Sequence, residues 1–441
     1  MIVIRRLIFK ILQKKEKMSK PRQPVHLGGF VKPGFEKVKD VFRSNLETQT
    51  EIGGTFAAYY KEELVVNLWG GYADQKAKRL WKEDTMPCVY STTKSASAVV
   101  IAHMVDRGLL SFSERVCKYW PEFANNGKED VTLEMYLSNR AGLSATNEKF
   151  PMSLILKDPV KLGHILANQK PLWKPGTNHG YHPVTFALYL DQIVRHADPL
   201  RRSLSQYFHD EIAKPFDIEF YIGLPEELHY RTPRIIIWKM LDAASYIQNF
   251  KGDPDILKLT SQSPTDFKSV RTMNDPDIKK LPVGSICGHG TAAAIAKLHS
   301  ILANGGVYQG KQLLSEDSIN KFQQISSGGV DLAFSMDGMW SYGPMVFPIA
   351  ETGKPLMYIF GHGGYGGQMG LADTRYKTGF CYATNYLDAS SRSGADDDKR
   401  WISMYETLYD CIYKLENIPS SQERRTFYEF GAFKKFKGSR L

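Results

Sequence analysis

The order of secondary-structure signals along the 441-residue chain restricts its fold more than any other feature. Strand-like segments rich in β-branched and aromatic residues occur early, at residues 55–60 and 64–72. Such segments return late, at residues 340–347, 357–360, 368–372 and 379–385. Between them, helical patterns with Pro- and Asp-rich connections dominate residues 109–330. This order predicts an α/β fold of the α+β type, with one antiparallel sheet built from both chain ends, flanked by helices, and an inserted helical lobe.

Apolar residues at helical spacing predict helices at residues 34–46, 91–108 and about 401–415. The predicted organisation is a basic amphipathic segment, a main domain and a basic C-terminal tail. Their bounds are residues 1–22, 23–415 and 416–441. Within the main domain, a sheet lobe takes about residues 23–90 and 331–415, and a helical lobe takes about 91–330. Residues 225–282 have the least regular pattern, and we interpret them as an excursion that covers a site.

The net charge of +10 is confined to the two ends of the chain. Residues 1–22 carry eight Lys or Arg against one Glu, and residues 423–441 carry six against two acids. The remainder is nearly neutral, which argues against nucleic acid as a partner because non-specific binding to it needs clustered cations. No apolar run reaches the roughly 18 residues that a membrane-spanning helix needs.

The five cysteines are odd in number, scattered and never spaced as C-x-x-C. This pattern is typical of free thiols in a reducing compartment. Neither a zinc-type Cys/His spacing nor an HExxH motif is present. The sequence therefore predicts no zinc site.

The two chain ends indicate different destinations. Residues 1–22 combine an apolar helical stripe with a basic face, which fits a mitochondrial transit peptide, a peripheral contact with acidic lipid as in a membrane-surface lipase, or a solvated tail. The chain finishes Ser439-Arg440-Leu441, a conservative variant of the peroxisomal Ser-Lys-Leu signal. The expected location is intracellular, with cytoplasm, peroxisome and mitochondrion left open, and oligomeric state is not predicted.

Ser91 and Lys94 form an S-x-x-K motif that opens an apolar helix. At this spacing both side chains lie on one helix face, so the lysine can accept the serine proton if its pKa is lowered. Ser318 and Lys321 match the same motif, but in a polar stretch with neighbouring acids. An ordinary N-cap serine is the alternative interpretation of Ser91.

Two later segments hold further candidates for chemistry. Tyr181 lies on a turn before an apolar helix, where a tyrosine can pass protons or simply pack. His362, Gly363 and Gly364, followed by Tyr365, interrupt strand-like sequence; glycines there allow a substrate to approach the strand backbone closely. A flexible hairpin connection is the alternative.

In this order, the Ser91/Lys94 pair, Tyr181 and the His362-Gly363-Gly364 triplet resemble the three motifs of the serine β-lactamase-related family. This family includes class C β-lactamases, penicillin-binding peptidases and esterases, and the resemblance is greatest to its eukaryotic β-lactamase-domain-containing proteins and its esterases. The resemblance implies an acyl-enzyme on Ser91, proton uptake by Lys94 and proton transfer to the leaving group by Tyr181. It also implies an oxyanion site between the backbone N–H groups of Ser91 and Tyr365, and a reaction that requires no metal and no organic cofactor.

Two positions depart from the β-lactamase pattern. Pro183 stands where an asparagine is usual, and His362 stands where a lysine usually begins the third motif. Histidine is largely neutral near pH 7 and binds a carboxylate less strongly than lysine does. These departures favour a small ester or peptide-like substrate over a β-lactam. The alternative function is a catalytically silent protein that uses the fold for binding or scaffolding.

Overall fold

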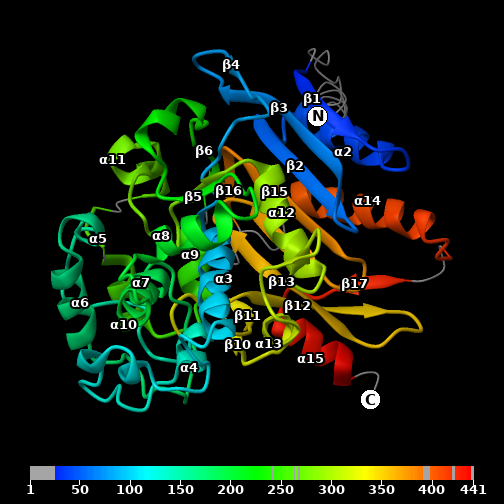
Figure 1. Ribbon diagram of the computed structural model, residues 1–441. Coiled ribbons are helices and arrows are strands. Elements are labelled where there is room, and N and C mark those ends of the chain that lie inside the picture. Colours follow the sequence, from blue (N-terminus) through cyan, green and yellow to red (C-terminus); the bar gives the residue numbers. More distant parts are fainter. Residues whose placement is uncertain are drawn as a thin grey trace, which may run out of the picture.

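The computed structural model describes residues 25–240, 242–262, 264–266, 269–390, 398–419 and 423–438. Within them, an 11-stranded sheet has the order β1-β3-β2-β15-β14-β13-β12-β11-β10, with β4 beside β3 and β17 beside β12 (Figure 1). The strands are β1 (Leu27–Val31), β2 (Gly53–Tyr60), β3 (Glu63–Asp74), β4 (Arg79–Leu80), β10 (Ser327–Val330), β11 (Asp337–Trp340), β12 (Met345–Glu351), β13 (Met357–Gly364), β14 (Gln368–Asp373), β15 (Thr378–Thr384) and β17 (Arg424–Thr426).

The two ends of the chain meet in the middle of this sheet. β2 pairs antiparallel with β15, with Tyr60 opposite Thr378 and Gly54 opposite Thr384. The early hairpin β2–β3 and the late strands β12–β15 therefore form one continuous ladder. The predicted antiparallel sheet, completed by both chain ends and flanked by helices, is confirmed.

Helices cover both faces of the sheet, and the alternation of side chains along β15 shows how. Phe380 and Tyr382 belong to the hydrophobic cluster that contains α2 (Glu36–Glu47) and α14 (Lys399–Leu415). Cys381 and Ala383 point the other way, into the cluster that contains α12 (Ala292–Ala303) and the helical lobe. Successive strand residues face opposite sides, so β15 is buried on both.

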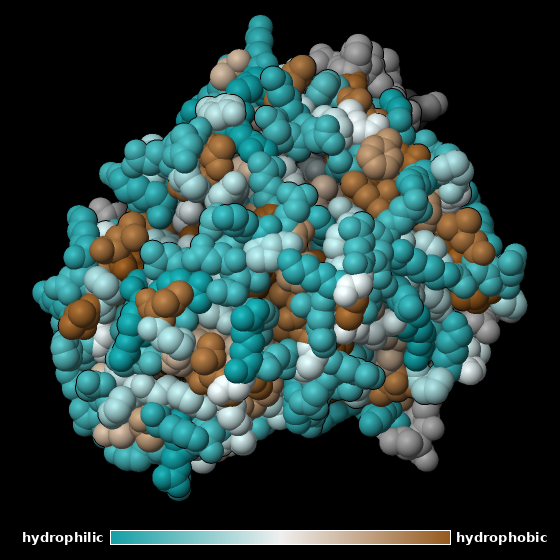
Figure 2. Space-filling model, viewed as in Figure 1, coloured by the Kyte–Doolittle hydropathy of each residue, from teal (hydrophilic) through white to brown (hydrophobic). Residues whose placement is uncertain are grey.

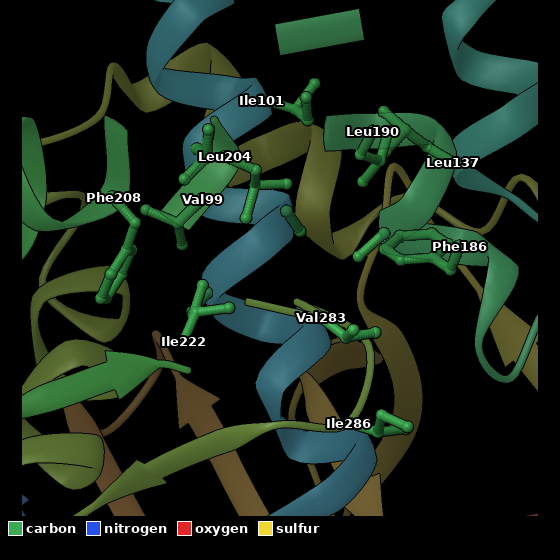
Figure 3. Packing of buried hydrophobic residues seen from close by; sticks show 14 of the residues in the cluster. Val99, Ile101, Leu137, Phe186, Leu190, Leu204, Phe208, Ile222, Val283 and Ile286 are labelled. Atoms are coloured by element: carbon green, nitrogen blue, oxygen red, sulfur yellow. The ribbon is translucent and has the colours of Figure 1, made fainter. Parts of the chain in front are cut away.

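The helical lobe is built around α3 (Thr93–Asp106), whose residues from Thr93 through Met104 are all buried. Figure 3 shows Val99 and Ile101 of α3 among Leu190, Leu204 and other apolar side chains of the surrounding lobe. A helix that is buried on all sides lies in the interior of the protein and is surrounded by other elements. The other helices and turns of the chain are η2 (Val116–Lys118), η3 (Pro121–Phe123), α4 (Leu133–Leu137), α5 (Leu154–Lys157), α6 (Pro159–Asn168), α7 (Thr185–Ala197), α8 (Leu204–Phe208), η4 (His209–Ala213), η5 (Glu226–Arg231), α9 (Ala243–Gln248), α10 (Pro254–Gln262), η6 (Val270–Asn274), α11 (Pro276–Lys279), α13 (Glu316–Gln323) and α15 (Phe430–Gly438).

Three two-stranded sheets accompany the main one, pairing β5 (Phe220–Ile222) with β7 (Gly288–Gly290), β6 (Ile236–Met240) with β16 (Tyr386–Ala389), and β8 (Val307–Tyr308) with β9 (Lys311–Gln312). The β6–β16 pair is parallel and ties the irregular 225–282 region to the strand that follows β15. Trp238 of β6 stacks on Tyr386 of β16, with ring centroids 5.1 Å apart. This region is thus anchored beside the carboxyl end of β15.

Two segments differ from the sequence-based expectation. The strand predicted at residues 340–347 is broken into β11 and β12 because Ser341 N–H donates to Pro344 O (2.9 Å) and Gly343 has a φ of 126°, which closes a tight turn. The segment expected as a tail from residue 416 contributes β17 to the sheet edge at β12 and packs Phe433 of α15 into the core. Residues 1–22 and the Ser439-Arg440-Leu441 ending lie outside the described residues.

The surface seen in Figure 2 is mainly hydrophilic, with apolar residues in small separate patches. No helix in the described ranges is both long enough and apolar enough to cross a membrane.

The position of Ile101 at the centre of the helical lobe generates a stability prediction. Ile101 is fully buried, so replacing it with alanine removes apolar contacts and leaves a cavity. We expect Ile101→Ala to lower the free energy of unfolding by about 2–5 kcal/mol, measured by urea denaturation. Leu156→Ala is the control, because Leu156 is 51% exposed and its loss should change stability by less than about 0.5 kcal/mol. Equal effects of the two changes would contradict the assignment of α3 as the core helix.

Candidate active site

Ser91 lies in η1 (Tyr90–Thr92), a 3-10 turn directly before α3. Every residue from 85 to 104 is buried except Ser91, which is partly exposed. The chain therefore presents one hydroxyl to solvent from an otherwise enclosed segment. Because this hydroxyl precedes the first turn of α3, it lies near backbone N–H groups at the positive end of a helix.

Tyr90, the residue before Ser91, has a left-handed φ of 45°. This conformation costs a non-glycine residue on the order of 1–3 kcal/mol and persists only where surrounding contacts enforce it. Those contacts come from β7, where Gly288 O accepts from Val89 N–H (3.0 Å) and Gly288 N–H donates to Thr93 Oγ1 (3.0 Å). Gly288 thus holds the turn at two points, one before Ser91 at Val89 and one after it at Thr93.

Lys94 is buried directly behind Ser91. Its Nζ lies 3.2 Å from Ser91 Oγ and donates to the backbone carbonyls of Pro183 (2.7 Å) and Ser285 (3.0 Å). Its exposed fraction is 1%. Burial disfavours the charged ammonium, so it lowers the pKa of Lys94 well below its usual value. A neutral amine within hydrogen-bond reach of a serine hydroxyl is the geometry of a general base.

Tyr181 and His362 close the other side of this pair. Lys94 Nζ lies 4.9 Å from the centroid of the Tyr181 ring, and the Tyr181 and His362 rings are 5.9 Å apart. Phe334 packs against Tyr181 at 6.3 Å. The tyrosine is 8% exposed, so it is held between the lysine, the histidine and an apolar wall.

The turn that carries Tyr181 is held by the neighbouring segment 137–143. Asn139 Oδ1 accepts from His182 N–H (3.1 Å), and Leu143 N–H donates to His182 Nε2 (3.0 Å). His182 Nδ1 contacts Gly180 O at 2.6 Å, so Nδ1 carries the proton because a carbonyl can only accept. Burial lowers the pKa of His182 to about 3. The hydrogen bonds of this neutral tautomer fix His182, the residue next to Tyr181.

His362, Gly363 and Gly364 form the last residues of β13. His362 Nδ1 donates to Gly363 O (2.6 Å), and the side chain is 2% exposed. Burial, followed by the nearby Lys94, lowers the pKa of His362 to about 3. The imidazole is therefore neutral near pH 7, with Nε2 as an acceptor.

The glycines of this strand allow it to approach the Ser91 turn. A Cβ added at Gly364 would lie 2.2 Å from Val89 O, so only glycine fits there. The next residue, Tyr365, packs its ring 6.0 Å from that of Tyr90. The start of the β13–β14 turn consequently lies beside the segment that carries Ser91.

The second S-x-x-K motif lacks this arrangement. Ser318 is buried in the first turn of α13, and its hydroxyl donates to Asp106 Oδ1 (2.8 Å). Lys321 instead places Nζ 5.1 Å from the centroid of the Tyr342 ring. The Ser318 hydroxyl is occupied by a carboxylate and serves the packing of α13 against α3.

The structure brings together all seven residues singled out in the sequence: Ser91, Lys94, Tyr181, His362, Gly363, Gly364 and Tyr365. Sequence reasoning missed Ser285 and the role of Pro183. Both act through backbone carbonyls, which every residue type has, so residue identity holds no signal for them. Within the described ranges, no cluster of three or more His, Cys, Asp or Glu side chains is placed to hold a metal ion.

A helix-borne serine and lysine, a tyrosine between the lobes and a glycine-rich strand end define the penicillin-recognising class of serine hydrolases. The Beta-lactamase family matches residues 38–402. The chain belongs to this family. It is a serine hydrolase with esterase-like relatives.

Three comparisons describe these relatives. Esterase/beta-lactamase LipL of Mycobacterium tuberculosis (strain ATCC 25618 / H37Rv) is 26% identical over 376 residues, covering 81% of this chain and 83% of that protein. The crystal structure of a family VIII carboxylesterase is similar at 32% identity and a TM-score of 0.77, covering 87% of this chain and 99% of that one. A penicillin-binding protein homolog from Caulobacter crescentus is similar at 29% identity and a TM-score of 0.76, covering 87% and 99%.

The lowered pKa of Lys94 generates a prediction about pH dependence. Lys94 must be unprotonated to accept a proton, so we expect kcat/KM to rise with pH and level off at a pH well below 10.5, the usual lysine value. Initial rates with a neutral ester across the pH range measure this rise, which is the ascending limb of the pH profile. Lys94→Arg should abolish it, because arginine stays protonated.

His362→Asn is the matched control for this assignment. The pKa of His362 is about 3, so its protonation does not change near neutrality. The midpoint of the ascending limb should stay in place whatever this change does to the rate. A shifted midpoint in His362→Asn, or loss of the ascending limb in this variant, would contradict the assignment of the limb to Lys94.

Proposed function

We propose that the protein hydrolyses esters through an acyl-enzyme on Ser91, and that it prefers esters whose acyl chain carries no charge. The observation that carries the proposal is the Lys94 amine, buried, lowered in pKa and 3.2 Å from the Ser91 hydroxyl. Serine is a weak nucleophile until a base removes its proton. Lys94 is placed to be the base that removes the proton of Ser91.

The proposed reaction has two stages. Lys94 takes the proton of Ser91 as Oγ attacks the ester carbonyl carbon, and the resulting oxyanion accepts hydrogen bonds from the backbone N–H groups of Ser91 and Tyr365. Tyr181 then passes a proton to the departing alkoxide, which leaves as an alcohol. The Lys94 ammonium returns its proton to Tyr181, so the lysine is neutral again. In the second stage Lys94 takes a proton from the water that attacks the acyl carbon. The bond between Ser91 Oγ and the acyl carbon then breaks, the carboxylic acid leaves, and the proton on Lys94 restores the Ser91 hydroxyl.

The charge state of the site supports an uncharged acyl group. The two basic side chains of the site, Lys94 and His362, are both buried with lowered pKa values. A buried carboxylate without a cationic partner is costly. The similar carboxylesterase and esterase/beta-lactamase support esters as substrates.

The chain ends supply the proposed location. We assign the protein to the interior of the cell, with Ser439-Arg440-Leu441 as the basis for the peroxisome and residues 1–22 as the basis for the mitochondrion or a peripheral membrane contact. Cytoplasm is the assignment if neither end acts as an address.

Covalent labelling tests the nucleophile. A fluorophosphonate probe should modify wild-type protein on the peptide that contains Ser91, as read by mass spectrometry, and Ser91→Ala should lose both labelling and ester hydrolysis. Ser318→Ala is the matched control, because it removes the serine of the second motif; it should keep both. Hydrolysis that survives in folded Ser91→Ala would refute the mechanism.

A matched pair of esters tests the preference for uncharged acyl groups. The two share a leaving group and chain length, and one acyl chain ends in methyl where the other ends in carboxylate. We expect kcat/KM to favour the neutral ester by at least about tenfold, since about 1.4 kcal/mol of unpaired-charge cost suffices for that ratio. His362→Lys should narrow the ratio, whereas His362→Asn should preserve it. Equal rates for both esters in the wild type would contradict the proposal.

A further inference from the structure

The turn between β13 and β14 carries the Tyr365 N–H of the proposed oxyanion site, yet its own backbone is poorly restrained. Gly366 and Gly367 have φ values of 82° and 113°, and glycine adopts many backbone conformations at little cost. Within the turn, Gly367 N–H reaches Gly364 O at 3.3 Å, a long hydrogen bond. A precise N–H direction at Tyr365 therefore needs support from outside the turn.

That support comes from Arg400 in the first turn of α14. Its Nη2 donates to Gly366 O (3.1 Å), which also accepts from Asp388 N–H of β16 (3.1 Å). The same guanidinium donates through Nη1 to Tyr386 O (2.5 Å). One side chain thus ties the turn to β16 and to the start of α14.

Two carboxylates hold this guanidinium in place. Asp398 Oδ1 accepts from Arg400 Nε (2.9 Å), and Glu51 Oε2 lies 3.8 Å from Nη1. Glu51 in turn accepts from the hydroxyl of Thr384 (2.6 Å) at the end of β15. Arg400 is 4% exposed, so the ion cluster is enclosed.

The turn lies directly on this cluster. A Cβ added at Gly367 would lie 2.4 Å from Asp398 Oδ2 and 2.8 Å from Arg400 Nη2. On the opposite side, a Cβ added at Gly364 would meet Val89 O. The strand end and turn are therefore packed between the Ser91 segment and the ion cluster, with no space for either to move independently.

We propose that Arg400 is a positioning residue that holds the Gly366 carbonyl, and with it the Tyr365 N–H, in the orientation that oxyanion stabilisation requires. This inference rests on the proposed function. Arginine suits the task because its planar fork donates to three acceptors at once, which a single lysine ammonium cannot reproduce in the same geometry. The Arg400 side chain acts through the turn and does not touch the substrate.

Steady-state kinetics of Arg400→Gln and Arg400→Lys test the inference. Both the acylation and deacylation stages pass through an oxyanion, so kcat for a neutral ester should fall about 10–100-fold in Arg400→Gln, while KM changes by less than about threefold. Arg400→Lys should recover part of the loss. Asp398→Asn, which keeps the shape of the cluster but weakens its hold on Arg400, should give a smaller loss of the same kind.

A thiono ester, in which sulfur replaces the carbonyl oxygen, gives a readout that general destabilisation would not move. Sulfur is a weaker hydrogen-bond acceptor, so a well-oriented oxyanion site favours the oxygen ester. The ratio of kcat/KM for the oxygen ester to that for the thiono ester should fall in Arg400→Gln. The pH midpoint of the Lys94 limb should stay unchanged.

Arg424→Gln is the matched control. Arg424 is also buried and paired with a carboxylate, Asp373 (2.7 Å), but it belongs to β17 and contacts Tyr409 of α14 instead of the turn. It should lower stability without changing the oxygen-to-thiono ratio. An unchanged kcat and ratio in folded Arg400→Gln and Asp398→Asn, or an equal fall in Arg424→Gln, would overturn the inference. Failure of the proposed function is a separate result, since it appears as wild-type protein not labelled on Ser91.

Discussion

The candidate site depends on the burial of the Lys94 amine away from water. Among the residues that the structure describes, its hydrogen-bond partners are the uncharged Ser91 hydroxyl and the carbonyls of Pro183 and Ser285, and none is a carboxylate. A charged ammonium is costly there, and the neutral amine that remains is the form able to accept a proton. The helical core around α3 maintains this enclosure, so packing far from the reacting atoms determines the protonation state at the centre.

Periodicity is sufficient to predict the sheet and its completion from both chain ends. The order of the three motifs, through its resemblance to a known family, singles out seven residues that the structure brings together. These features depend on local patterns, namely alternation in the strands and helical spacing after Ser91. Spacing alone does not separate Ser91 from Ser318, because both motifs place a lysine one helical turn after a serine. Tertiary contacts separate them, since Asp106 occupies the Ser318 hydroxyl.

The remaining features arise from contacts between residues distant in sequence. Ser285 and Pro183 contribute carbonyls, and carbonyl positions are not encoded by side-chain type. Arg400 looks like a surface residue of an amphipathic helix until β16 and the β13–β14 turn are placed beside it. The C-terminal segment is expected as a basic tail because its six Lys or Arg outnumber its acids, yet Arg424 pairs with Asp373 and Phe433 packs into the core.

The pairing of β2 with β15 has a consequence for the order in which the molecule is made. More than 300 residues separate the two strands, so the central ladder cannot close until the ribosome has synthesised almost the whole chain. Pairing across such a distance is slow, and until it occurs β2 presents an unprotected edge, since β3 is already paired with β1 and β2. A nascent chain that stops just before β15 therefore contains the turn at Tyr365 but lacks both the strand that joins β14 to β2 and the Arg400 side chain that holds this turn. Premature termination there leaves an open sheet, and such a fragment needs protection from aggregation.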